Sequence, residues 1–123
     1  MTIVLWILIG LLALVSLAVA LMKLVRPKEK LAAMGDPFAW TADFSQGQIR
    51  LIAVAELLGA VGLVLPGATG ILPWVSGIAA VGIAILQVGA IVTHLRRGER
   101  AVIPNIVIVV LAVVVAVLVF LGY

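Results

Sequence analysis

Apolar residues occur along the chain in four long runs, which are separated by short connections that contain charged residues, proline or glycine. The runs cover residues 3–22, 49–65, 71–92 and 102–121. Each run is close to the ~20 residues that an α-helix needs to cross the ~30 Å hydrocarbon core of a bilayer. Short connections favour antiparallel neighbours. The pattern predicts an all-α polytopic membrane protein, an antiparallel bundle of four transmembrane helices in a single domain over residues 1–123.

Local sequence signals predict where these spans begin and end. Ser45 and Gln48 form a capping box that opens the second span. The Leu65–Gly67 segment is expected to end that span, because proline and glycine do not sustain a helix. Pro73 suits the first turn of the third span. In the first connection, Asp36 is expected to cap a short interfacial helix that has Pro37 in its first turn.

Composition limits the function classes. The chain is 66% hydrophobic and 11% charged, too apolar for a soluble domain to cover its own surface. Its net charge of +3 comes from basic residues that flank the spans, so the partner is the lipid bilayer and we expect no nucleic acid. The chain has no cysteine and one histidine, which leaves no thiol chemistry and no metal site.

Basic residues also predict the orientation in the membrane. All 8 lysines and arginines lie within Lys23–Arg50 or Arg96–Arg100. Because basic connections stay in the cytoplasm, we expect the connections at residues 23–48 and 94–101 to be cytoplasmic and both termini to be outside. The expected location is the plasma membrane of a bacterial cell.

Glu56 is the most informative polar residue within the spans. It lies two turns inside the second span, about 9 Å beyond Arg50. Its carboxyl group should therefore face the bundle interior, where it is protonated, hydrated or paired with a cation. Two interpretations stay open: a structural ion pair with Arg50, Lys23 or His94 that fixes helix register, and a group that contacts ligand or transfers a proton.

The third span carries a stripe of small and polar residues that should face other helices. On that stripe Gln87 lies about 10 Å deeper than His94, at a depth similar to that of Glu56. We therefore expect a polar cavity in the cytoplasmic half of the bundle. Its candidate ligand-binding residues are Lys23, Arg50, Glu56, Gln87, His94 and Asn105. Glu56 and His94 are the candidates for proton transfer, while Gln87 and Asn105 also suit a structural role as hydrogen-bond partners between helices.

Three segments resemble the DoxX-like family of small four-helix membrane proteins. They are RLIAVAELLGAVGLVLP at 50–66, the alanine pair at 79–80 and AIVTHLRRGE at 90–99, and Lys23 and Asn105 match as well. The resemblance covers nearly the whole chain and implies the same six candidate residues. It also implies a link to quinone-coupled sulfur oxidation and membrane redox complexes, which belong to the wider DoxX group, whereas remote animal relatives resemble receptor-assembly chaperones.

Our leading hypothesis is that the cavity binds a small amphipathic ligand, such as a quinone headgroup or a lipid, in a membrane subunit of a redox system. Hydrogen bonds from Gln87, His94 or Arg50 would hold a carbonyl oxygen, and Glu56 would move a proton. Whether the chain is itself an enzyme stays open, and no covalent cofactor is expected. The alternative is an assembly or scaffold protein whose small-residue faces bind another membrane protein or a second copy. A transporter is disfavoured because four short helices without a repeat leave little room for alternating access.

Overall fold

The computed structural model describes residues 2–34, 41–42, 44–99 and 102–123, which contain helices and no strand. In chain order the helices are α1 (Ile3–Val25), α2 (Lys28–Ala33), α3 (Gln46–Thr69), α4 (Val75–Arg96) and α5 (Ile103–Phe120). All but the short α2 are long and apolar enough to cross a membrane. The predicted all-α polytopic fold is therefore confirmed.

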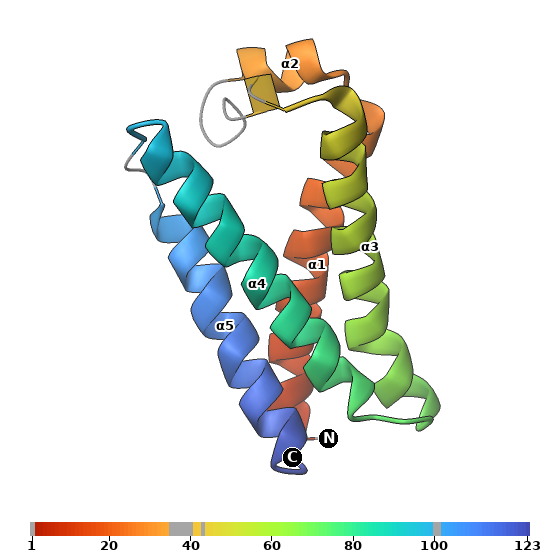
Figure 1. Ribbon diagram of the computed structural model, residues 1–123. Coiled ribbons are helices and arrows are strands. Elements are labelled where there is room, and N and C mark those ends of the chain that lie inside the picture. The colour runs from red at the N-terminus through yellow and green to blue at the C-terminus, as the bar shows by residue number, and fades with distance from the viewer. Residues whose placement is uncertain (1, 35–40, 43, 100–101) are drawn as a thin grey trace.

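The four long helices form two antiparallel pairs, α1 with α3 and α4 with α5 (Figure 1). Helix α4 also packs on α3, and α5 packs on α1. Both chain termini lie at one end of the bundle, where the backbone N–H of Thr2 donates a hydrogen bond to the Tyr123 carbonyl at 2.9 Å. We call this the terminal end and the opposite one the α2 end. The two pairs converge at the terminal end and diverge towards the α2 end.

An apolar core fills the half of the bundle next to the terminal end. Leu5, Ile9 and Leu12 of α1 are fully buried there against Leu63 of α3 and Ile83 of α4. The remaining buried members of this core are Ala13, Ala60, Ala80, Ala112, Val115 and Ala116. Small residues dominate this list because they let membrane helices approach closely.

Glycines set the distance between α3 and α4. A Cβ atom at Gly59 would lie 3.0 Å from Cγ1 of Ile83, and one at Gly62 would lie 3.1 Å from Cβ of Ala79. Ser76 reinforces the contact, since its hydroxyl donates a hydrogen bond of 2.9 Å to the Leu63 carbonyl. The small residues of the second and third spans thus pack these two helices together.

The capping box predicted at the start of α3 is confirmed. The Gln48 backbone N–H donates to Ser45 Oγ at 3.1 Å, and the Ser45 N–H donates to Gln48 Oε1 at 2.9 Å. The predicted end of the same helix was wrong, because α3 continues through Pro66 to Thr69. One proline in a last turn removes a single backbone donor, and the Thr69 hydroxyl adds a bond of 2.7 Å to the Leu65 carbonyl. Gly70, with φ of 71°, then ends the helix in the left-handed conformation.

Other boundaries differ as well. Helix α4 begins at Val75, so Pro73 belongs to the preceding turn and not to the first helical turn. Helix α1 extends to Val25 and α4 to Arg96, so Lys23 and His94 lie inside helices and not in connections. Both side chains are buried, at 5% and 3% exposed, so each continues its helix inside the bundle and does not reach out to water.

A short helix does occur in the first connection, at α2. Its Leu31 is fully buried against Ile49 of α3, and Val19 and Met22 of α1 pack on the same cluster. These contacts hold α2 against both α1 and α3. The short helix predicted from Asp36 and Pro37 lies outside the described residues.

Candidate functional site

A cavity of about 260 Å³ lies between α1, α3 and α4, in the half of the bundle next to the α2 end, which we call the α2 half. Its polar lining comes from Lys23, Glu56, Gln87 and Thr93. The rest of its lining is apolar and consists of Phe44, Ile52, Ile85, Leu86, Gly89 and Ala90. A polar cavity in this half of the bundle is what the depth of Glu56 and Gln87 along their helices predicts.

Lys23 and Glu56 both line this cavity, and they form a buried ion pair between α1 and α3. Nζ of Lys23, in the last turns of α1, contacts Oε1 of Glu56 on α3. The two residues are 5% and 4% exposed. A single charge at this depth would be costly, whereas a hydrogen-bonded pair is tolerated. Of the three cations considered as partners for Glu56, the structure therefore selects Lys23.

Gln87 lines the cavity and also forms a hydrogen bond with α5. Asn105 Nδ2, in the first turn of α5, donates a hydrogen bond of 2.9 Å to Gln87 Oε1. Asn105 does not line the cavity, but Gln87 does. The pair is thus the interhelical hydrogen bond that amides commonly form in membrane bundles, and it fixes one side of the Gln87 amide.

His94 belongs to the end of α4 and not to the cavity wall. It is 3% exposed, and its Nδ1 lies 2.5 Å from Glu99 Oε2. Arg97 Nε donates to the other Glu99 oxygen at 2.6 Å. The chain can fold back in this way because Gly98 has a φ of 76°, and the Glu99 N–H then caps the His94 carbonyl at 2.9 Å.

The same contacts act on the charge of Glu99. Hydrogen bonds from Arg97 and, second, from His94 favour its ionised form, so they hold the pKa of the Glu99 carboxyl below its ordinary value of 4.5. Glu99 is therefore a structural anion that closes the helix end.

Arg50 is placed differently from the other predicted residues. Its side chain is exposed on α3 and does not line the cavity. The structure thus brings Lys23, Glu56 and Gln87 together at the cavity, with Asn105 behind Gln87, and leaves Arg50 and His94 outside it.

Sequence reasoning did not single out Phe44 or Thr93, which also line the cavity. Thr93 lies beside His94 in the sequence, but its hydroxyl donates to the Gly89 carbonyl at 2.9 Å, a bond within α4. Phe44 comes from the connection before α3, where no periodic pattern marks which side chains turn inwards. Within the described ranges, no cluster of three or more His, Asp or Glu side chains is arranged to hold a metal ion.

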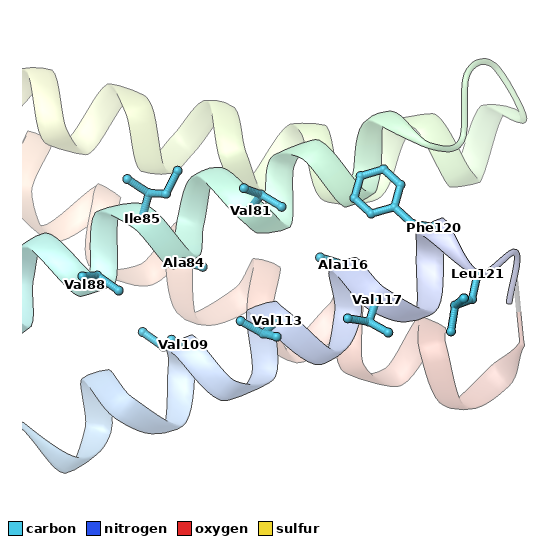
Figure 2. Close-up of a pocket in the computed structure, with 10 residues that line it drawn as sticks. All are labelled: Val81, Ala84, Ile85, Val88, Val109, Val113, Ala116, Val117, Phe120 and Leu121. Atoms are coloured by element: carbon cyan, nitrogen blue, oxygen red, sulfur yellow. The ribbon is translucent and has the colours of Figure 1, made fainter.

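A larger groove of about 650 Å³ lies between α4 and α5 in the half next to the terminal end (Figure 2). Valine, alanine and isoleucine side chains line it, and Phe120 and Leu121 close it towards the chain terminus. Because this lining is wholly apolar, the groove suits hydrocarbon and offers no group for chemistry.

Residues 7–118, which include most of each membrane-spanning helix and all the polar groups of the cavity, match a model of the DoxX-like family. The chain belongs to the DoxX-like family. The resemblance of the three sequence segments is thereby confirmed. No curated protein and no solved structure shows a significant match to the chain.

Proposed function

We propose that this DoxX-like protein binds a small amphipathic ligand, a quinone or a lipid-like molecule, in the cavity of the α2 half and serves as a subunit of a membrane redox system. The observation that carries the proposal is the meeting of the Lys23–Glu56 ion pair, the Gln87 amide and apolar walls at one cavity. Ligand sites are concave and mostly apolar, with a few convergent polar groups. Ionisable side chains inside membrane spans also mark functional sites more often than not.

The size of the cavity supports a headgroup as the bound part. Its volume of about 260 Å³ is below the ~300–1,000 Å³ typical of pockets for drug-sized ligands. One ring or one polar headgroup fits that space, while an attached hydrocarbon tail would continue along Ile52, Ile85 and Leu86 towards lipid. We assign the electron-carrying chemistry to such a ligand and to a partner protein.

The cavity is proposed to face the cytoplasm. Every lysine and arginine that the structure describes lies in the α2 half, and none lies at the terminal end. Basic residues near membrane spans stay on the cytoplasmic side. A reporter fused to the C-terminus should therefore be active outside the cell, and a cytoplasmic signal from it would contradict this orientation.

The test is mass spectrometry of the small molecules that remain with the chain after purification from native membranes in a mild detergent. We expect a stoichiometric quinone or lipid that is lost from Glu56→Gln. Arg50→Gln is the matched control, because it removes an exposed charge on the same helix outside the cavity, and it should retain the ligand. Equal retention by both variants, or no retained molecule in the unmodified chain, would contradict the proposal.

An assembly role is the second candidate, and two exposed glycines of α4, one of which lines the cavity, are the observation that favours it. Gly82 and Gly89 lie two turns apart, and a Cβ atom at either would meet nothing within 4 Å. Such a face accepts a closely packed helix from another protein. A stoichiometric membrane protein in the same purification, with no small molecule retained, would support this role over ligand binding.

A further inference from the structure

The two carboxylate oxygens of Glu56 have different surroundings. Oε1 contacts the Lys23 ammonium group, whereas Oε2 accepts no hydrogen bond within the described part of the chain. Among those residues, the fully enclosed side-chain polar atom without a partner is Gln46 Nε2. Glu56 Oε2 is therefore not sealed inside the protein, and since the Glu56 side chain lines the cavity, this oxygen is available there to a ligand.

We infer that the ligand presents a hydroxyl hydrogen to Glu56 Oε2, so that the site binds a reduced, hydroxyl-bearing ring of the hydroquinone class in preference to the oxidised quinone. The inference rests on the proposed function and deepens it. A carboxylate in an ion pair accepts hydrogen bonds and donates none. A quinone carbonyl placed against it would bring two acceptors together with no hydrogen between them, and both would lose their hydration.

Gln87 supplies the complementary group. Its Oε1 is occupied by Asn105, so the amide nitrogen is the atom that remains for the cavity, and within the described residues Gln87 Nε2 donates to no protein atom. The site thus offers an acceptor on α3 and a donor on α4, while Lys23 Nζ on α1, which also lines the cavity, is engaged by Glu56 Oε1. A hydroxyl group matches both, because its hydrogen donates while its oxygen accepts. A quinone carbonyl matches the donor alone.

The charges of Glu56 and Lys23 also favour a ligand that carries a hydroxyl group. Among the described side chains that line the cavity, the charges of Glu56 and Lys23 balance each other, so these groups do not favour an anionic headgroup. A hydroxyl-to-carboxylate bond is charge-assisted and is stronger in a low-dielectric site than a bond between neutral groups. Neutral ring hydroxyls are thereby favoured over phosphate groups as well as over carbonyls.

The inference is tested by binding to the purified chain in detergent under an oxygen-free atmosphere. The probes are a decyl-substituted 1,4-benzohydroquinone, the corresponding quinone and the hydroquinone dimethyl ether, whose oxygens carry no hydrogen. Equilibrium dialysis against the same micelles without protein corrects for partitioning. We expect the hydroquinone to bind at least about tenfold more tightly than either other probe, since sites built around a hydroxyl reject analogues that lack it.

Variants assign the preference to named atoms. In Glu56→Gln the side chain keeps its shape but loses the charged acceptor, so hydroquinone binding should weaken and the ratio of quinone to hydroquinone dissociation constants should fall towards one. Arg50→Gln should leave the ratio unchanged. If Glu56→Gln does not fold, Gln87→Leu serves instead, because it removes the α4 donor that a quinone carbonyl would accept from and should raise the ratio.

The outcomes separate the inference from the proposed function. Tighter binding of the hydroquinone, weakened in Glu56→Gln, supports both. Equal or tighter binding of the quinone to the unmodified chain overturns the inference and leaves ligand binding at the cavity in place. Failure of all three probes to bind overturns the proposed quinone site itself.

Discussion

The buried ion pair between Lys23 and Glu56 predicts that loss of either charge destabilises the bundle much more than loss of both. In Lys23→Met the carboxylate keeps its charge at a site that is 4% exposed, and in Glu56→Leu the ammonium group is left at one that is 5% exposed. Removing one partner of a buried pair costs about 3–5 kcal/mol. Both groups line a cavity that water can enter, so we expect the lower value, about 3 kcal/mol for each variant.

The double variant behaves differently because it removes both charges of the pair. Its methionine and leucine fill a similar volume with hydrocarbon, and replacement of a buried pair in this way is often neutral or stabilising. We expect the free energy of unfolding of Lys23→Met/Glu56→Leu to lie within about 1 kcal/mol of that of the unmodified chain. The cycle of four proteins should therefore show a coupling energy of several kcal/mol.

The assay is unfolding by sodium dodecyl sulfate in mixed micelles, followed by helical circular dichroism and extrapolated linearly. Arg50→Gln is the control for loss of an exposed charge and should change stability by less than about 0.5 kcal/mol. If the double variant loses as much stability as the two single variants combined, the two charges are not coupled and the reasoning fails.

Three further predictions follow from the packing and from the helix end. Gly59→Ala should cost about 1–3 kcal/mol because its Cβ would lie 3.0 Å from a buried isoleucine, whereas Gly82→Ala, with open space around it, should be neutral or stabilising by up to about 1 kcal/mol in the same assay. Asn105→Leu should cost about 0.6–2 kcal/mol, and a second change at Gln87 should add less than it does alone, as a double-mutant cycle measures. Since the pKa of Glu99 is lower in the folded chain than its ordinary 4.5, its contribution to stability is present above that value and is lost as the pH falls through the folded-state pKa. Carbon-13 NMR of the Glu99 carboxyl should give a midpoint below 4.5, and a midpoint at or above it would contradict the contacts seen at this helix end.

The spans could be predicted from sequence because their cause is local. Length and apolarity decide whether a helix crosses a bilayer, and the capping box at Ser45 is read from residues three apart. The end of α3 could not be predicted in the same way. A proline near a helix end can stop the helix or be accommodated in its last turn, and here the Thr69 hydroxyl and the left-handed Gly70 accompany the second outcome.

The partner of Glu56 was open for a different reason. Arg50 and Lys23 both lie at the α2 side of their spans, so depth alone does not choose between them. Helix rotation does, because Arg50 precedes Glu56 by six positions and points about 120° away from it on an α-helix of 3.6 residues per turn. Arg50 is accordingly exposed while Glu56 is buried. Which face of α1 meets that carboxyl depends on packing between helices, which periodicity does not fix.

His94 shows the limit of the rotation argument. It follows Gln87 by seven positions and therefore shares its helix face, yet it does not line the cavity. The reason is a contact from beyond the helix, since the turn at Gly98 brings Glu99 back onto the imidazole. A charge five residues away along a connection has no period, so a helical pattern cannot place it.

The distribution of apolar and charged residues between the two halves explains why the site can be tested by substitution. The fully buried leucines and isoleucines of the main core lie in the half next to the terminal end, whereas Lys23, Glu56 and Gln87 lie in the half where the helix pairs diverge. At the α2 end, Leu31 and Ile49 hold α2 against the α1–α3 pair. Because none of the fully buried residues of these two clusters lines the cavity, Glu56→Gln should change what the cavity binds while the helices keep their arrangement, at the cost in stability that loss of one charge of the pair predicts.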